Sequence, residues 1–196
     1  TLGAVETGIA VADFNGDGQL DTAIVDGQAS GCAALTSSTS LVWGPCLPVG
    51  SFPTSIAAGD LDGDGQLDLI TADRGSSQLS LLRGHGVMPF YAAVAIPVPS
   101  ARTVLLGDLD HDGDLDDPLG RDASLFVIFP DGSGSLGAPV HYEARSYPSL
   151  APQLADLNGD GFLDIVGTKR LASSLHVRLN DGQGAFPDEL VYPVGA

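Results

Sequence analysis

Short apolar segments alternate along the chain with polar stretches that are rich in Gly, Asp, Asn and Ser. Apolar runs precede acidic stretches at 56–58 and 104–106, and others follow them at 69–71 and 165–167. Runs of this kind, bounded by turn residues, are typical of β-strands. The 26 Gly and 13 Pro residues favour many tight turns. The pattern therefore predicts an all-β protein built from many short strands.

The same series of segments recurs four times. Acidic loops begin at Asp13, Asp60, Asp108 and Asp156, which are 47, 48 and 48 residues apart. A third strand-like piece with a Gly-containing hairpin turn and a fourth closing piece complete the unit. Four antiparallel strands in about 48 residues is the size of one β-propeller blade. We therefore expect a single repeat domain over 1–196, a β-propeller-type array of four four-stranded antiparallel blades at about 1–51, 52–99, 100–147 and 148–196.

Two of the units depart from this pattern. The first replaces the regular hairpin with the segment 31–47, which contains Cys32 and Cys46. The third has Pro118 where its second strand should begin, and Pro cannot donate a hydrogen bond to a sheet ladder. We expect that strand to be shortened, shifted or bulged.

The number of repeats leaves the closure of the ring open. Four blades can form a small ring, while a larger ring needs a partner chain or more sequence. A closed four-bladed ring, a ring of two copies and a part of a larger propeller therefore stay as alternatives.

The charge of the chain narrows the range of partners. Eight Lys and Arg residues against 25 Asp and Glu residues give a net charge of −17. Such a charge repels the nucleic-acid backbone and anionic lipid headgroups. No apolar run approaches the roughly 20 residues that a membrane-spanning helix needs. We expect no nucleic-acid partner and no membrane insertion.

Each acidic loop spans nine residues and carries oxygen-bearing side chains at alternate positions. Positions 1, 3, 5 and 9 are Asp or Asn, and position 6 is always Gly, which permits a sharp turn. Position 7 varies in side chain, as expected if it offers only its backbone carbonyl. The candidate ligands are Asp13, Asn15, Asp17, Gln19 and Asp21; Asp60, Asp62, Asp64, Gln66 and Asp68; Asp108, Asp110, Asp112, Asp114 and Asp116; and Asp156, Asn158, Asp160, Phe162 and Asp164.

The donor set of these loops indicates calcium. Calcium takes six to eight oxygen ligands, whereas zinc prefers Cys and His, and magnesium usually keeps several waters. The loops differ from an EF-hand because the closing acid is Asp at position 9, and strand-like sequence surrounds it. We expect about four calcium ions, one in each loop.

Cys32 and Cys46 lie 14 residues apart in one irregular segment. A disulfide between them suits an oxidising compartment, and a pair of reduced, packed thiols is the alternative. We predict the disulfide and, with it, an extracellular location, secreted or at the cell surface.

The sequence shows no arrangement of catalytic residues. The four histidines, at positions 85, 111, 141 and 176, lie at unrelated places in the repeat. Paired carboxylates can serve a glycosidase, but catalysis needs one asymmetric pair, and here the pattern occurs four times. We therefore expect a protein that is not an enzyme.

The loops and the Leu-Asn-Asp-Gly-x-Gly-x-Phe pattern at 179–186 resemble FG-GAP or VCBS repeats. That resemblance covers nearly the whole chain. It implies calcium-binding β-propeller blades of the kind found in integrin alpha subunits and in many bacterial surface or secreted proteins. The family includes adhesion receptors, lectins and non-catalytic parts of enzymes, so the resemblance specifies the fold more closely than the function.

The expected function is a calcium-binding extracellular recognition or adhesion module for a protein or glycan ligand. A non-catalytic accessory or lectin-like domain of a secreted polysaccharide-active enzyme is one alternative, and a structural spacer is another. In a four-stranded meander, successive turns alternate between the two ends of the sheet, so the acidic loops leave the opposite end free of calcium. We expect ligand binding at that end, with Arg102, Arg145 and Tyr147 as candidate residues.

Overall fold

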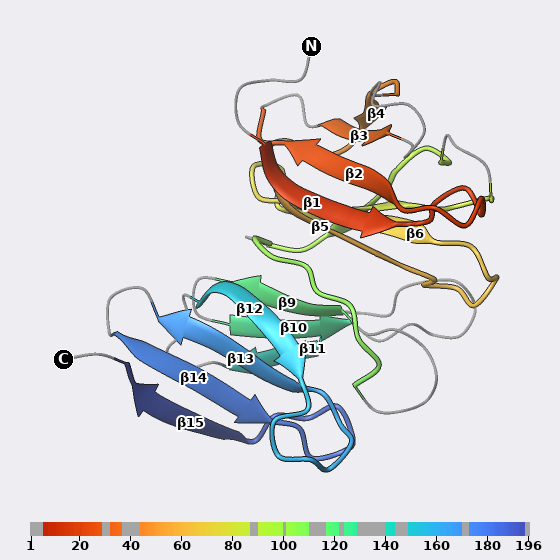
Figure 1. Ribbon diagram of the computed structural model, residues 1–196. Coiled ribbons are helices and arrows are strands. Elements are labelled where there is room, and N and C mark those ends of the chain that lie inside the picture. Colours follow the sequence, from red (N-terminus) through yellow and green to blue (C-terminus); the bar gives the residue numbers. More distant parts are fainter. Residues whose placement is uncertain are drawn as a thin grey trace. The chain divides into compact units, whose positions relative to one another are not determined.

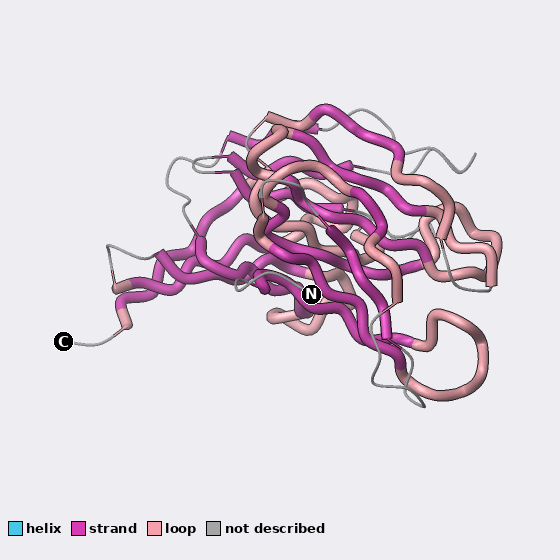
Figure 2. The backbone as a smooth tube through the Cα atoms, turned by 90° about the horizontal axis from the view of Figure 1, so that it is seen from above, coloured by secondary structure: helices cyan, strands magenta, loops and turns pink. Residues whose placement is uncertain are grey.

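The computed structural model describes residues 6–28, 32–36, 44–86, 90–99, 101–109, 117–121, 124–128, 140–143, 149–169 and 173–194. These residues form strands and turns and contain no helix (Figure 2), so the predicted all-β class is confirmed. Accordingly, the described residues contain no helix of the length and apolar character that crossing a membrane requires. The chain divides into two compact units, Thr1–Val104 and Leu105–Ala196, and each is described by itself.

The first unit contains two four-stranded antiparallel sheets (Figure 1). In each sheet the strands follow one another in sequence order, as a meander does. The last strand of the first sheet has only two residues. This sheet belongs to the first sequence repeat, which lacks the regular hairpin. The strands are β1 (Glu6–Ala12), β2 (Asp21–Asp26), β3 (Cys32–Thr36) and β4 (Leu47–Pro48), then β5 (Pro53–Gly59), β6 (Asp68–Asp73), β7 (Gln78–Leu82) and β8 (Val94–Pro97).

The second unit contains a third four-stranded meander and one sheet of three described strands. Four complete blades therefore remain a prediction, while three four-stranded sheets are observed. The three-stranded sheet has the order β11-β10-β9. The strands are β9 (Asp117–Arg121), β10 (Ser124–Ile128) and β11 (Val140–Glu143), then β12 (Ser149–Ala155), β13 (Asp164–Lys169), β14 (Ser174–Leu179) and β15 (Asp188–Pro193).

The strand that contains Pro118, β9, is described over Asp117–Arg121, and the residues directly before and after it lie outside the described part of the chain. The expected shortening, shift or bulge of this strand therefore stays a prediction. Pro118 lies opposite Val127, and β9 is at the edge of the sheet among the strands described. An edge position tolerates Pro because its missing N–H does not interrupt an inner ladder.

The core of the first unit lies between its two sheets. β6 is buried along its whole length, so its apolar residues Leu69, Ile70 and Ala72 do not follow the strict alternation of a strand with one exposed face. Phe14 and Phe90 meet edge to face, with ring centroids 5.9 Å apart. A Cβ atom on Gly8 would lie 3.1 Å from the Ile56 nitrogen, so this glycine lets β1 approach β5 closely. The buried cluster comprises Phe14, Ala23, Val25, Ala33, Leu35, Ile56, Leu69, Leu82 and Phe90.

The core of the second unit is smaller in its described part. Leu109, Ile165 and Phe186 are buried together, and Leu154 and Leu163 pack against them. Gly107 permits this packing, because a Cβ atom there would lie 2.7 Å from a methyl carbon of Leu154.

The two cysteines lie on the two paired strands that end the first sheet. Cys32 opens β3 opposite Pro48, and Cys46 directly precedes β4. The part of the chain that the structure describes contains no free cysteine. The Cys32–Cys46 disulfide stays a prediction, and the pairing of β3 with β4 supports it.

We expect thiol titration of the unfolded, unreduced protein to find no free thiol. A disulfide that closes a loop of about 15 residues contributes on the order of 3 kcal/mol in the chain-entropy model, so reduction should also lower the melting temperature. The titration repeated after reduction serves as the control. Two thiols in the unreduced sample would contradict the prediction.

Candidate calcium centre

Three of the four acidic loops lie within the described residues, and each joins the first two strands of a four-stranded sheet. Loop one connects β1 to β2, loop two connects β5 to β6, and loop four connects β12 to β13. Each loop turns at two glycines with positive φ, at positions 4 and 6. From the sequence, a sharp turn was predicted only at position 6, although position 4 is also Gly in these three loops. The angles are 74° and 82° at Gly16 and Gly18, 71° and 82° at Gly63 and Gly65, and 80° and 94° at Gly159 and Gly161.

The first aspartate of each loop organises the backbone that follows it. In loop two, Asp60 Oδ1 accepts hydrogen bonds from the N–H groups of Gly63 and Asp64 at 2.8 and 3.2 Å. Its Oδ2 accepts one from Gly65 at 2.8 Å. Asp13 accepts all three equivalent N–H groups of its own loop, and Asp156 accepts those of Gly159 and Gly161. The loop is thus closed around its first carboxylate.

These hydrogen bonds also favour the charged form of the carboxylate. At Asp13, the N–H group of Gly18 is the largest cause of a lowered pKa, and the N–H groups of Gly16 and Asp17 act in the same direction. Asp13 therefore stays ionised at neutral pH and can bind a cation.

The closing aspartate at position 9 is buried in all three loops. Asp21, Asp68 and Asp164 are each 1% exposed or less. One oxygen of each accepts the N–H of the residue at position 2, at 3.2, 3.1 and 2.9 Å respectively. The closing carboxylate thereby joins the start of the loop to the first residue of the following strand.

In loops two and four, the closing aspartate also binds the hairpin that follows the third strand. Asp68 Oδ1 accepts the N–H of Gly84 at 2.8 Å, and Asp164 Oδ1 accepts the N–H of Asn180 at 2.9 Å. Each of these loops therefore lies beside that hairpin at one end of its sheet, as a meander predicts. The opposite end carries the turn between the second and third strands.

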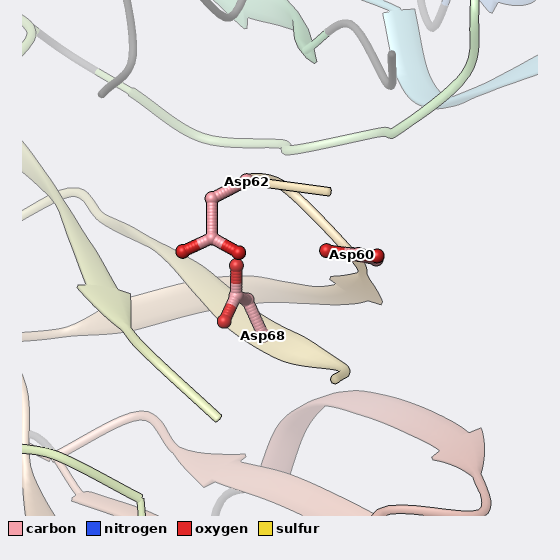
Figure 3. Close-up of side chains that lie close together, drawn as sticks. All are labelled: Asp60, Asp62 and Asp68. Atoms are coloured by element: carbon pink, nitrogen blue, oxygen red, sulfur yellow. The ribbon is translucent and has the colours of Figure 1, made fainter. Parts of the chain in front are cut away.

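Loop two brings three carboxylates together. Asp60, Asp62 and Asp68 each place one oxygen within 4.8 Å of the other two (Figure 3). Burial raises the pKa of Asp68, while the N–H of Gly84 and the charge of Arg83 oppose that rise. Clustered hard oxygen donors of this kind fit a calcium ion, which would supply the positive charge that offsets their mutual repulsion.

Loops one and four have an amide where loop two has Asp62. Asn15 Nδ2 donates to Asp17 Oδ2 at 3.2 Å, and Asn158 Nδ2 donates to Asp160 Oδ2 at 2.7 Å. The amide thus holds the carboxylate at position 5, and its own oxygen accepts the backbone N–H of that residue. These loops carry one negative charge less than loop two and offer the same kinds of oxygen donor.

Arg83 is a residue of loop two that sequence reasoning missed. Its Nη1 lies 2.7 Å from Asp62 Oδ2 and 2.9 Å from Asp68 Oδ2, so one guanidinium bridges two of the three clustered carboxylates. In the fourth repeat Leu179 stands at the corresponding position, at the end of β14. In the sequence, Arg83 is visible as a basic residue one position after the third strand. Only the fold shows that its side chain reaches loop two.

The side chain at position 7 has a packing role that was not predicted. A Cβ atom on Gly86 would lie 2.6 Å from Gln66 Oε1, and one on Gly182 would lie 2.9 Å from Phe162 Cε2. Gln66 and Phe162 therefore occupy the space beside these hairpin glycines. The expectation that position 7 offers only its backbone carbonyl was incomplete, because its side chain also joins loop and hairpin.

Some predicted site residues lie outside the described part of the chain. In loop three these are Asp110, Asp112, Asp114 and Asp116, and Asp108 alone is described. Of the candidate ligand-binding residues, Arg145 and Tyr147 are also outside it. Arg102 is described and partly buried, and its carbonyl accepts a hydrogen bond from Thr54 at 2.6 Å.

A hydrogen-bonded row of Ser174, His176 and Glu189 lies on β14 and β15. Ser174 Oγ is 2.9 Å from His176 Nε2, and His176 Nδ1 is 2.9 Å from Glu189 Oε1. The spacing is similar to that of a nucleophile, base and acid. Ser174 is only 5% exposed, however, and a nucleophile has to reach its substrate. The row is better explained as mutual satisfaction of buried polar groups.

The loops match a known family of sequence repeats. A family model described as an FG-GAP-like repeat matches residues 13–71 and 60–116, which together span just over half of the chain. No curated protein sequence matches the chain.

Solved structures share the fold, and three of them are described here by their likeness to this chain. The first is an Agrocybe aegerita lectin described as recognising non-reducing terminal N-acetylglucosamine, with 19% identity and a TM-score of 0.62. The second is a Tc holotoxin pore of Photorhabdus luminescens, with 21% identity and a TM-score of 0.52. The third is Bap1, a biofilm matrix protein of V. cholerae, with 20% identity and a TM-score of 0.54.

The matched part is almost the whole of this chain and a smaller part of each of the other proteins. The alignments cover 95%, 100% and 91% of this chain, and 52%, 10% and 30% of the three matched chains. At these identities the likeness extends to the fold.

We expect calcium removal to lower the melting temperature, because the carboxylates of each loop would repel one another. At a free calcium concentration 100 times the Kd, each site adds about 2.7 kcal/mol to the free energy of unfolding. Asp64→Ala should remove one bound ion and leave the others, as measured by calcium content after gel filtration. Asp188→Ala, an exposed aspartate outside the loops, is the control and should lose none. A melting temperature that chelation leaves unchanged would rule out these sites.

Arg83→Leu should make loop two more dependent on calcium, since the variant removes the positive charge between Asp62 and Asp68. We expect the calcium-free variant to lose about 2 kcal/mol of stability, and calcium to restore most of it. The measurement is the difference in melting temperature with and without calcium. Arg74→Leu changes an exposed arginine of the same unit and should leave that difference unaltered. Equal differences in both variants would contradict the role given to Arg83.

Proposed function

Because the chain belongs to the FG-GAP-like repeat family, we propose that it is a calcium-stabilised, non-catalytic module of propeller type that recognises a glycan outside the cell. The observation that carries the proposal is the repetition of one loop geometry in three sheets. A catalytic site needs a single asymmetric set of groups, whereas a repeated set serves a repeated structural ion. Calcium in this view stabilises one end of each sheet.

Glycan recognition is supported by the likeness over 95% of the chain to the Agrocybe aegerita lectin, which is described as binding N-acetylglucosamine. The likeness to a biofilm matrix protein agrees with an extracellular role. A protein ligand, an accessory role beside a polysaccharide-active catalytic domain, and a spacer role remain the alternatives. Since the chain spans about half of that lectin, further blades from the same or another chain would be compatible with this function.

The recognition surface in this proposal is the calcium-free end of the sheets. The acidic loops concentrate negative charge at the other end, and this charge disfavours an anionic ligand there. Arg102, Arg145 and Tyr147 belong to the segments that precede first strands, so they are retained as candidate contacts at the calcium-free end.

A glycan array with the calcium-loaded protein tests the proposal. We expect binding to a defined set of glycans, with affinity reduced when calcium is removed because the fold is destabilised. The control is the protein with Asp64 and Asp160 both changed to Ala, which should lose two of its calcium ions and part of the affinity that full chelation removes. Absence of binding to any glycan would contradict a glycan-recognition role and would favour protein recognition or a spacer.

A further inference from the structure

An exposed aromatic residue in a strained conformation lies at the calcium-free end of the second sheet. Phe52, the residue before β5, has a φ of 49°, a left-handed value that is uncommon for any residue with a side chain. Its side chain is 50% exposed. A strained conformation persists only where the surroundings enforce it, and such positions concentrate at functional sites.

Backbone hydrogen bonds on both sides enforce this conformation. The N–H of Phe52 donates to the Gln28 carbonyl at 2.9 Å, and its carbonyl accepts the N–H of Arg74 at 3.2 Å. The N–H of Gly75 donates to the Ser51 carbonyl at 2.9 Å. A Cβ atom on Gly75 would lie 2.5 Å from Phe52 Cδ2, so the glycine leaves room for the ring.

A buried carboxylate, that of Asp73, holds the segment before β5 by a hydrogen bond. Asp73 is fully buried at the end of β6 and accepts hydrogen bonds from Thr71 Oγ1 at 2.8 Å and Ser80 Oγ at 2.5 Å. It also accepts the N–H of Gly50 at 3.0 Å. The segment that carries Phe52 is therefore fixed to the turn between β6 and β7 before any ligand arrives.

The ring of Phe52 lines a cavity of about 550 Å³ together with Gly27, Pro53, Thr54, Arg74 and Gly75. This volume is in the range of small-molecule sites. Arg74 is the charged residue among the six, and its side chain is exposed. In the described part of the chain its guanidinium makes no ion pair, since the neighbouring Asp73 is engaged by Thr71, Ser80 and Gly50.

The repeat does not require this arrangement. At the positions equivalent to Phe52, the other three repeats have Val5, Ser100 and Pro148. The fourth repeat comes nearest to it, with Arg170 at the position of Arg74 and Tyr147 one residue before the position of Phe52, whereas the first and third repeats have Gly27 and Asp122 in place of Arg74.

We propose that the Phe52–Arg74 cavity binds a sugar residue that carries a carboxylate, such as a uronic or sialic acid. The flat ring of Phe52 offers an apolar surface to one face of a pyranose ring. The guanidinium of Arg74 matches a carboxylate in charge and in planar, two-pronged geometry. In a chain with a net charge of −17, an anionic ligand is admitted only where such a cation lies. This inference rests on the proposed glycan-recognition function and specifies its ligand class and site.

The test uses the whole calcium-loaded chain and ligand-observed NMR titration. The probes are the methyl glycosides of glucuronic acid and N-acetylneuraminic acid, with methyl glucoside as the uncharged match. Phe52→Gly removes the ring at a φ that glycine adopts freely, so the fold is preserved while the platform is lost. Arg74→Gln removes the charge from an exposed position.

We expect at least one of the two acidic glycosides to bind with an affinity about tenfold higher than that of methyl glucoside. Phe52→Gly should weaken that binding at least tenfold without lowering the melting temperature by more than a few degrees, and Arg74→Gln should abolish the preference for acidic sugars. Tyr91→Ala is the matched control. Tyr91 is an exposed aromatic between β7 and β8, at the acidic-loop end of the same sheet, and its loss should leave binding unchanged.

Three outcomes would overturn the assignment. Glycan binding that both variants leave unchanged would show that the site is elsewhere, with the proposed function intact. Binding of a peptide carboxylate at Arg74, with no response to acidic sugars, would assign the cavity to a protein ligand. No binding to any glycan, on the array or in the titration, would overturn the proposed function and this site with it.

Discussion

The fold depends at each described acidic loop on one buried carboxylate, the aspartate that closes the loop. Asp68 is 1% exposed, yet it accepts N–H groups from Leu61 and Gly84 and pairs with Arg83. A charge buried this deeply is costly unless it is fully hydrogen-bonded. These partners come from the loop, the following hairpin and the end of a third strand. The need to satisfy one carboxylate therefore fixes the register of three chain segments at one end of the sheet.

The same need explains the difference between the loops. Loop two has three acids whose carboxylate oxygens lie within 4.8 Å of one another, and Arg83 bridges two of them, so part of its charge is offset within the protein. Loop four has Leu179 in that place and Asn158 in place of an acid, and it reduces repulsion by carrying less charge. A cation added to such a loop completes an arrangement that the backbone N–H groups have already shaped.

Features that repeat could be predicted from the sequence, and features that occur once could not. The period placed the acidic loops between first and second strands. Arg83 escaped because its distance from Asp62 is set by the pairing of β6 with β7. The strain at Phe52 escaped for a similar reason, since it arises from hydrogen bonds to Gln28 and Arg74, which are far from it in sequence. Single residues held by tertiary contacts leave no periodic signal.

β6 connects the two ends of the second sheet. Its six residues are all buried, with Asp68 at the acidic-loop end and Asp73 at the opposite end, next to Arg74 of the Phe52 cavity. Burial raises the pKa of both aspartates, and at both positions hydrogen bonds offset part of that effect. Each carboxylate thus holds a loop at its own end of one strand, at the cost of its own desolvation. Because the strand forms or unfolds as a unit with its ladder, a cation bound at loop two stabilises the turn that carries Arg74 as well. This linkage gives calcium a role in recognition without requiring it to touch the ligand.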